Sequence, residues 1–228
     1  MDGWLPPVLL SLRIAVVATA VVFCLGTVAA WAMVKLRWPG KQVVDALFTL
    51  PLVVPPTVTG FVLLLLLGRK GPLGRLFGLG GAEILFTWWA GVIASAVVAF
   101  PLMYSTARAG LQSGDETLEK AARTLGASEA RIFFTVTLPL AWPGLGAGLV
   151  LSFARALGEF GATLMVAGNI PGKTQTVPTA IWAAAEAGDM RTAGFLVGIM
   201  LVFGFSATWA SRAWSEWRFG KHVQSRRG

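Results

Sequence analysis

Residues Ser113 to Pro139, with the sequence SGDETLEKAARTLGASEARIFFTVTLP, form the one long polar run in an otherwise hydrophobic chain. Ser113 followed three residues later by Glu116 is a capping-box pattern, which predicts a helix beginning one or two residues after Ser113. Gly126 stands where a glycine commonly ends a helix. Ser128 is a suitable N-cap for a second helix that leads to Pro139. The run therefore predicts two helices separated by Gly126.

The first of these helices carries a narrow apolar stripe. Its members recur at the i, i+3, i+4 and i+7 spacing of one helix face, and they are Leu118, Ala121, Ala122 and Leu125. Acidic residues precede basic ones by four positions in the pairs Glu116–Lys120 and Glu119–Arg123, the favourable order in a helix. A helix lying on lipid is the alternative. Two alanines offer lipid little apolar area but let a partner backbone approach closely, so the stripe favours a protein partner.

The composition around this run is that of a membrane protein. Of 228 residues, 55% are hydrophobic and 13% are charged, about half the charged fraction of a soluble domain. The fold class expected is therefore an all-α membrane protein with about five transmembrane helices, each of roughly 20 apolar residues. The ranges expected to span are 8–34, 43–68, 84–107, 140–168 and 192–212, within a transmembrane domain over 8–213; a loop over 111–139 separates the third and fourth spans, and a basic tail covers 214–228.

Several kinds of chemistry lack the residues they need. Cys24 is the single cysteine and His222 the single histidine, so we expect no disulfide, no metal site and no cysteine–histidine catalytic pair. The net charge of +8 reflects basic loops that orient a membrane protein rather than nucleic-acid binding. No catalytic residues and no cofactor are expected.

Prolines interrupt the second apolar range. Pro51, Pro55 and Pro56 remove backbone donors and should kink or break a helix. Irregular backbone at membrane depth must lie against protein or a water-filled cavity. Pro55 and Pro56 therefore line a pore or form a packing kink, and the sequence leaves both open. Elsewhere, Gly144 and Gly148 form a GxxxG pair that permits close helix approach, and Gly194 and Gly198 form a second.

Lysine and arginine counts set the expected orientation. With the N-terminus outside, the segments expected in the cytoplasm hold twelve basic residues and the outer segments hold five, with Arg13 and Arg155 inside spans. The excess predicts an outer N-terminus and a cytoplasmic C-terminus.

Arg155 and Glu159 lie one helical turn apart in the fourth range. Charges at such depth usually face the protein interior and are paired. We expect an internal ion pair in preference to direct contact with a ligand.

The polar run resembles a loop of a known protein family. AARTLGASEARIFFTVTLP looks like the cytoplasmic EAA loop of binding-protein-dependent ABC importer permeases, whose pattern is E-A-A, three residues, G, nine residues and I-x-L-P. The matching positions are Ala121, Ala122, Gly126, Val136, Leu138 and Pro139. Lys120 stands at the glutamate position, and Glu119 lies one residue earlier. The resemblance implies that Glu116, Leu118, Glu119, Lys120, Ala121, Ala122, Leu125 and Gly126 couple the chain to an ATPase.

The resemblance extends along the chain. LPLVVPPTVTGF and SFARALGEFGATLMVAGNIPGKTQTVPTAIW are similar to permeases of molybdate importers, and sulfate/thiosulfate permeases are related. This implies a type I ABC importer permease fold with a coupling helix between spans three and four, working as a homodimer in the bacterial inner membrane. Cytoplasmic ABC ATPase subunits, which bind the ATP, and an extracytoplasmic molybdate-binding protein are the implied partners. The outer mouth is implied at Asn169, Pro171, Gly172 and Thr174.

A nucleotide site in the chain itself is not expected. GNIPGKT at 168–174 resembles a P-loop but has three residues between its glycines where the motif needs four. The function expected is ATP-driven import of molybdate, with the same role for sulfate, thiosulfate or tungstate as the alternative. A proton-coupled transporter or channel is the alternative of another class.

Overall fold

The computed structural model describes residues 3–36, 39–76, 84–114 and 116–224. The side chains of residues 116, 207 and 210–224 also lie outside the description. Among the described residues every regular element is a helix. This confirms the all-α prediction. Of the predicted tail at 214–228, only the backbone to residue 224 is described, and it continues the last helix.

Four long helices build the body of the molecule: α1 (Leu5–Lys35), α5 (Trp88–Gln112), α8 (Leu138–Leu157) and α11 (Met190–Gln224). Shorter elements connect them: α2 (Lys41–Thr49), η1 (Leu50–Leu52), α3 (Pro56–Leu67), α4 (Pro72–Leu76), α6 (Glu116–Thr124), α7 (Glu129–Ile132), η2 (Phe133–Thr137), α9 (Gly161–Ala167) and α10 (Val177–Glu186).

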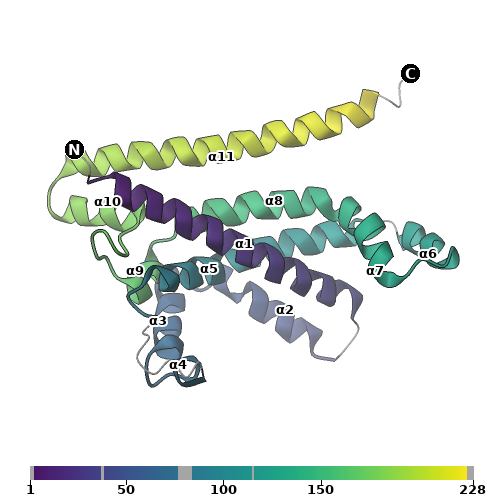
Figure 1. The fold of residues 1–228 in the computed structure, drawn as a ribbon, viewed down its shortest axis with the longest axis horizontal. Coiled ribbons are helices and arrows are strands. Elements are labelled where there is room, and N and C mark those ends of the chain that lie inside the picture. Colours follow the sequence, from purple (N-terminus) through teal and green to yellow (C-terminus); the bar gives the residue numbers. More distant parts are fainter. Residues whose placement is uncertain (1–2, 37–38, 77–83, 115, 225–228) are drawn as a thin grey trace.

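The helices α1, α5 and α8 pack against one another along their length, and α11 runs beside them (Figure 1). The short helices α6 and α7 lie at one end of this bundle (Figure 1). The α10 helix and the turn into α11 lie at the other end. The two segments singled out in the sequence, the polar run and the loop after α9, are therefore at opposite ends of the molecule.

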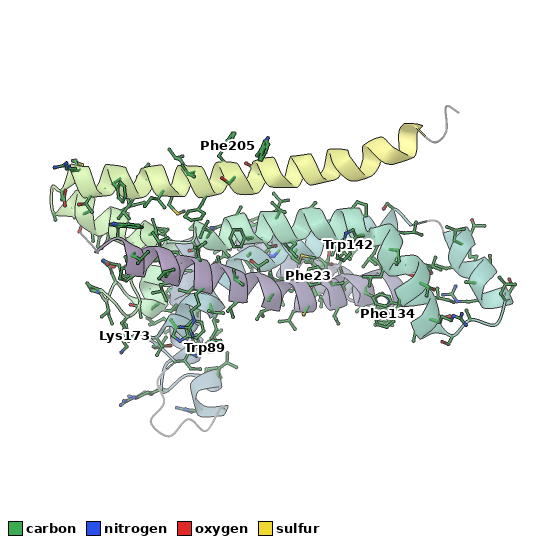
Figure 2. The ribbon with its side chains drawn as sticks, turned by 45° about the horizontal axis from the view of Figure 1, so that its top comes forward. Phe23, Trp89, Phe134, Trp142, Lys173 and Phe205 are labelled. Atoms are coloured by element: carbon green, nitrogen blue, oxygen red, sulfur yellow. The ribbon has the colours of Figure 1, made fainter. Side chains whose placement is uncertain are left out.

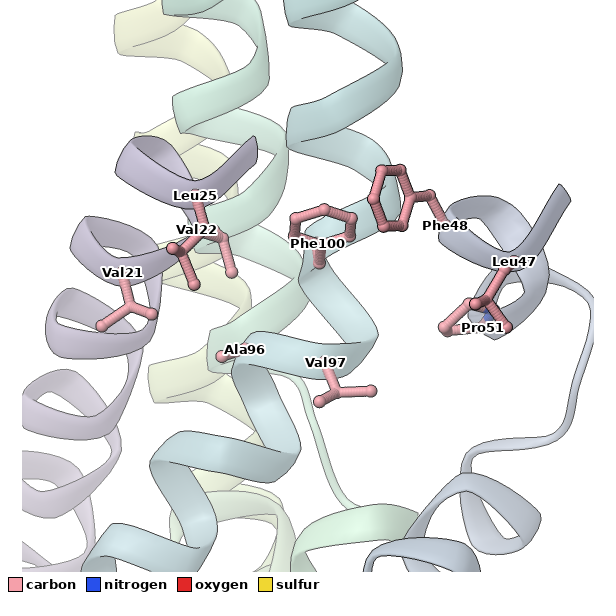
Figure 3. A pocket seen from close by; sticks show the side chains of 9 residues that line it. All are labelled: Val21, Val22, Leu25, Leu47, Phe48, Pro51, Ala96, Val97 and Phe100. Atoms are coloured by element: carbon pink, nitrogen blue, oxygen red, sulfur yellow. The ribbon is translucent and has the colours of Figure 1, made fainter. Parts of the chain in front are cut away.

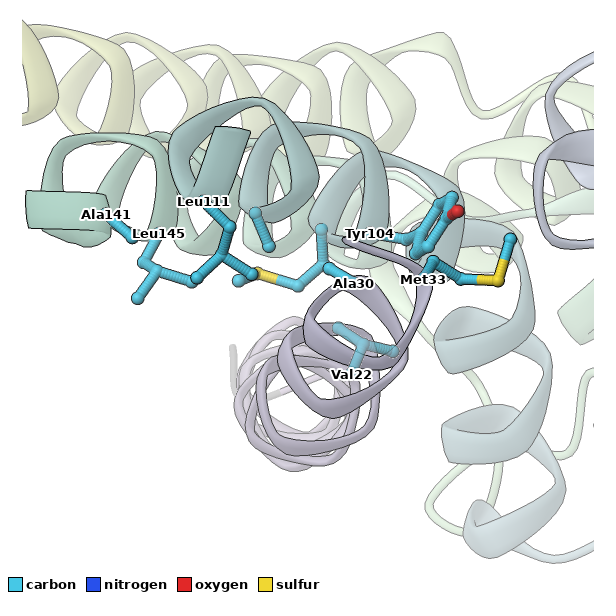
Figure 4. Close-up of a cluster of buried hydrophobic side chains, with 9 residues drawn as sticks. Val22, Ala30, Met33, Tyr104, Leu111, Ala141 and Leu145 are labelled. Carbon is cyan, nitrogen blue, oxygen red and sulfur yellow. The ribbon is translucent and has the colours of Figure 1, made fainter. Parts of the chain in front are cut away.

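Small residues allow α5 and α8 to approach closely. A Cβ atom on Gly144 would lie 2.7 Å from the Cα of Gly110, and one on Gly148 would lie 2.3 Å from the Thr106 hydroxyl. The predicted close approach at Gly144 and Gly148 is thus confirmed. Beside this contact, buried side chains of α1, α5 and α8 form a core cluster that includes Met33 and Tyr104 (Figure 4).

Among the described residues, three helices are long and apolar enough to cross a membrane: Leu5–Lys35, Trp88–Gln112 and the continuous run Glu129–Leu157. The second predicted span is not straight, since Lys41–Leu52 and Pro56–Arg75 meet at 113°. The prediction that the prolines break this helix is confirmed. The fifth predicted span lies within α11, whose apolar part is Met190–Ser206.

The fourth predicted range, 140–168, is not one helix. The α8 helix ends at Leu157, and α9 begins at Gly161. The sequence ALGEFG allows this break because Gly158 and Gly161 lower helix propensity on both sides of Glu159. The second GxxxG pair does not pack within the chain, because Cβ atoms on Gly194 and Gly198 would meet nothing within 4 Å.

Candidate functional site

The polar run folds as two helices around a glycine, as its sequence predicts. Gly126 has φ +79°, a left-handed conformation that suits glycine. Its N–H donates to the Arg123 carbonyl at 3.0 Å, and the Ala127 N–H donates to the Ala122 carbonyl at 3.1 Å. These two bonds are those of a Schellman motif. Ser128 then caps α7 by accepting from the Arg131 N–H at 3.4 Å.

The predicted capping role of Ser113 differs from the structure. Ser113 is the C-cap of α5, and its hydroxyl donates to the Gly110 carbonyl at 2.8 Å. The α6 helix begins at Glu116, slightly later than expected. Side-chain contacts of Glu116 lie outside the described residues, so its predicted coupling role stays a prediction.

The apolar stripe of α6 lies on the surface of the chain. Leu118 is 49% exposed and Leu125 is 87% exposed. Ala121 is exposed and Ala122 is half-buried. An exposed apolar patch on a helix outside the bundle is a candidate interaction site. Within the single chain, this face of α6 is available for docking.

The opposite side of α6 is anchored through Glu119. Its carboxylate pairs with Lys35 at the end of α1 and accepts from the Thr137 hydroxyl at 2.7 Å. Arg123 lies 3.7 Å from the same carboxylate and also donates to Glu129 of α7 at 2.9 Å. One acid thus joins α6 to α1 and to η2.

The surroundings of Glu119 act on its titration in opposite directions. Burial of the carboxyl raises its pKa, but hydrogen bonds from Lys35 and Thr137 and the charges of Lys35 and Arg123 outweigh this effect. The pKa of Glu119 is therefore held below its ordinary value. The acid is kept ionised by its partners.

This geometry bears on the departure from the EAA pattern at Lys120. Lys120 is exposed, whereas Glu119 has a side chain only 12% exposed. The acid of this chain therefore points into its own bundle, and the residue at the usual glutamate position points outward.

The predicted pair at the other end of α8 is present. Arg155 Nη2 lies 2.8 Å from Glu159 Oε2, and the Glu159 side chain is 1% exposed. Because Glu159 lies in the break after α8, its other oxygen can accept from the Ala162 N–H of α9, at 2.8 Å. Glu159 therefore neutralises a charge and satisfies a free helix N-terminal donor, a second role that sequence reasoning missed.

The proline break lies beside this pair. A Cβ atom on Gly161 would be 3.2 Å from Pro56, and one on Gly60 would be 2.7 Å from the Cα of Ala162. The α3 and α9 helices thus pack backbone to backbone. Pro56 is half-buried in this contact, and Pro55 is exposed. The structure brings Pro56 and Glu159 into one region, and their role in a pore stays a prediction.

The loop predicted at the outer mouth has a fixed base and an exposed tip. Thr174 is fully buried, and its hydroxyl accepts from the Ile170 N–H at 3.1 Å. Pro171 and Gly172 are exposed at the tip, next to Lys173 (Figure 2), and Gly172 has φ +73°. Asn169 carries a buried side-chain oxygen. The loop lies between the helices α9 and α10, so the described residues around it include no strand of the kind that a P-loop requires.

Sequence reasoning missed one polar cluster. Asp45 of α2 pairs with Arg108 of α5 and accepts from the Tyr104 hydroxyl, and Arg108 donates to that hydroxyl at 3.3 Å. The available signal was Asp45, an acid inside the second apolar range. Arg13, predicted inside a span, lies over the Trp88 ring, with its guanidinium carbon 4.0 Å from the ring centroid.

Comparison with known proteins decides the family. The model of the binding-protein-dependent transport system inner membrane component matches residues 22–217. The chain belongs to this family. It is a permease of an ABC importer and a multi-pass protein of the inner membrane. The family match covers both the polar run and the Arg155–Glu159 break.

Curated members of this family align over most of the chain. A putative molybdenum transport system permease from Bacillus subtilis is 48% identical over 200 residues, covering 87% of this chain and 88% of that protein. The molybdenum permease ModB of Escherichia coli K12 is 42% identical over 211 residues, covering 90% and 92%. A probable sulfate permease from Chlorella vulgaris is 35% identical over 194 residues, covering 85% and 73%.

Solved permease structures share the fold. The inward-facing methionine transporter MetNI superposes with a TM-score of 0.73 at 17% identity, covering 93% of this chain and 94% of that chain. A bacterial alginate importer superposes with a TM-score of 0.73 at 16% identity, covering 93% and 80%. The predicted type I ABC importer permease fold is confirmed.

Proposed function

We propose that this permease carries molybdate across the membrane through a pore at the centre of a homodimer, with the energy supplied by a separate ATPase. Molybdate is proposed as the substrate because the chain is more similar in sequence to molybdenum permeases than to sulfate permeases. Proteins named as molybdenum permeases are 38–48% identical over about nine-tenths of the chain, whereas proteins named as probable sulfate permeases are 34–35% identical.

The exposed stripe of α6 is the proposed ATPase contact. It presents Leu118, Ala121 and Leu125 without burying them in the chain. Movement of α6 would reach α1 through the Glu119–Lys35 ion pair and α8 through Thr137. The ATPase binds and hydrolyses ATP, and this chain converts its closure into rearrangement of the helices.

The proposed orientation places α6 in the cytoplasm and the 168–176 loop outside. The basic-residue excess supports it, and so does the position of these two segments at opposite ends of the molecule (Figure 1). An extracytoplasmic molybdate-binding protein would then deliver the anion at the outer end. The exposed tip at Pro171 and Gly172 is the proposed contact.

Reconstitution tests this function. The permease is reconstituted in proteoliposomes with its ATPase on the inner side and the binding protein outside. These proteoliposomes should accumulate molybdate when they enclose ATP. Parallel uptake of tungstate and sulfate measures selectivity. Faster transport of sulfate than of molybdate would assign the chain to the sulfate branch instead.

A proton-coupled transporter is the alternative from another class. Such proteins need ionisable relays inside the membrane, and the buried acid here, Glu159, is paired with Arg155 and with a backbone donor. Uptake driven by a proton gradient, with no ATPase present, would support that alternative and contradict the proposal.

A further inference from the structure

The α2 helix lies at the surface of the bundle. None of its residues, Lys41–Thr49, is buried. Gly40 at its N-cap has φ +86°, so a glycine turn precedes it. After η1, the chain reaches Pro55 in an extended conformation, and the direction changes by 113°. The segment α2–η1 is therefore a short rigid rod between two turns.

Polar contacts hold this rod to α5. Asp45 contacts both Arg108 and Tyr104, and Arg108 donates to the Tyr104 hydroxyl at 3.3 Å. The two α5 residues lie one helical turn apart and therefore share a face. Tyr104 is itself 1% exposed, so packing fixes the α5 side of the contact, and Asp45 supplies the polar contact from α2.

Aromatic rings extend the same contact by one turn. Phe48 of α2 meets the Phe100 ring at 5.3 Å and the Tyr104 ring at 5.2 Å, both edge to face. This geometry is favourable for aromatic pairs. Asp45 and Phe48 are three residues apart, so one face of α2 makes both the polar and the aromatic contact.

On the side toward α1, α2 borders open space. A cavity of about 250 Å³ lies between α1, α5 and the α2–η1 rod. Figure 3 shows Leu47 and Pro51 on one side of it and Val21 and Leu25 of α1 on the other. Its lining is apolar and includes Leu47 and Pro51, so this side of the rod borders unfilled space. The rod therefore has room to move when its hold on α5 is released.

The α5 face that holds α2 is connected to the coupling segment. Arg108 lies four residues before Gln112, where α5 ends, and α6 begins at Glu116. A displacement of α6 therefore reaches Arg108 through the three residues between the two helices and about one turn of α5.

We propose that Asp45, Tyr104 and Arg108 form a latch that positions the α2–η1 rod on α5, and that release of this latch lets the rod and the proline break move during transport. The three are positioning residues, since the proposal gives none of them contact with the anion. The inference rests on the proposed coupling role of α6 for its trigger, but the latch itself is tested without transport.

The first test is a distance measurement on the intact permease–ATPase complex. With Cys24→Ser as background, spin labels at Val43→Cys and Ser105→Cys report the α2–α5 distance. Labels at Val28→Cys and Ser105→Cys report the α1–α5 distance as the control. Diluting labelled chains with unlabelled ones removes signals between subunits. Asp45→Ala should broaden the α2–α5 distribution and leave the α1–α5 distribution unchanged.

The second test separates the latch from general folding. Uptake per ATP hydrolysed should fall about fivefold in Asp45→Ala, and the exchange Asp45→Arg with Arg108→Asp should restore both uptake and the narrow α2–α5 distance. Unchanged α2–α5 distances in Asp45→Ala, or equal broadening of the control pair, would overturn the latch. Absence of ATP-driven uptake in the wild type would instead count against the proposed function and leave the distance result standing.

Discussion

A glutamate paired with a basic residue lies near each end of α8, Glu119 on α6 and Glu159 after Leu157, and the two pairs are built differently. Glu119 joins α6 to Lys35, 84 positions away in the chain, and part of this network is open to solvent. Glu159 pairs with Arg155 within one turn and is 3% exposed. The first pair links separate elements that can move, and the second fixes a local break in the chain.

This difference follows from what each acid satisfies. Glu159 accepts from the Ala162 N–H as well as pairing with Arg155, so removing it leaves the half-buried Arg155 without this partner and leaves a helix donor without its acceptor. Removing Glu119 leaves Lys35, whose side chain is 33% exposed and can be solvated. We therefore expect the Glu159 end to determine stability and the Glu119 end to determine coupling.

The largest expected effect is that of Glu159→Ala. The change removes the acceptor of the buried Ala162 N–H, and a buried donor left unsatisfied costs about 1–3 kcal/mol. The thermal unfolding temperature of the purified permease should fall markedly, together with its yield. Glu159→Gln is the matched control, because its amide oxygen can still accept from Ala162. A wild-type unfolding temperature in Glu159→Ala would contradict the structural role of this pair.

Gly126→Pro should have the next largest effect, and on transport rather than on folding. Proline cannot adopt φ +79°, and it removes the N–H that donates to Arg123. We expect uptake to be lost while the bundle still folds, since α6 and Gly126 lie outside it. Gly126→Asn, which tolerates the left-handed conformation, should retain most uptake. Normal ATP-driven uptake in Gly126→Pro would exclude the coupling role of this turn.

The Glu119 network predicts a pH dependence. The pKa of Glu119 in the folded protein is lower than normal. The ionised carboxylate therefore contributes its full stabilisation above the unfolded pKa of about 4.3. This stabilisation is lost as the pH falls through the folded pKa. The stability difference between wild type and Glu119→Gln should be about 1 kcal/mol near pH 7 and should shrink toward pH 3. Melting curves across this range measure it. A difference that grew as the pH fell would reverse the sign and refute the assignment.

The smallest expected effect is that of Lys120→Glu. The side chain is on the surface, so stability should change by less than about 0.5 kcal/mol. Any change in ATPase stimulation would then report on the partner contact at the position where the family pattern has an acid. A large loss of stability would show that Lys120 takes part in the Glu119 network.

Regular patterns predicted most of this architecture. The stripe at Leu118–Leu125, the break at Pro55–Pro56 and the close approach at Gly144 each follow from local rules, and each is present in the structure. The pair of Arg155 and Glu159 was predictable because both are costly charges in an apolar range. Each of these features depends on residues close together in the sequence, so it could be predicted without knowing the contacts between distant parts of the chain.

Features that depend on distant contacts were not predictable in the same way. The partners of Glu119 are Lys35 and Thr137, and no spacing rule connects position 35 with position 119. Asp45 was visible as an acid in an apolar range, but its pairing with Arg108 depends on how α2 folds back onto α5. The end of α8 at Leu157 did have a local signal in Gly158 and Gly161, but the expected span ran through these residues to position 168.

The central claim is that the exposed face of α6 couples this permease to its ATPase, and Leu125→Asp tests it most directly. Leu125 is 87% exposed, so a charge there disturbs little inside the chain. ATP-dependent molybdate uptake and ATP hydrolysis would be measured together in proteoliposomes, with Ala130→Asp on α7 as the control. We predict that Leu125→Asp melts like the wild type and loses uptake, while Ala130→Asp transports. Wild-type uptake by Leu125→Asp would contradict the account.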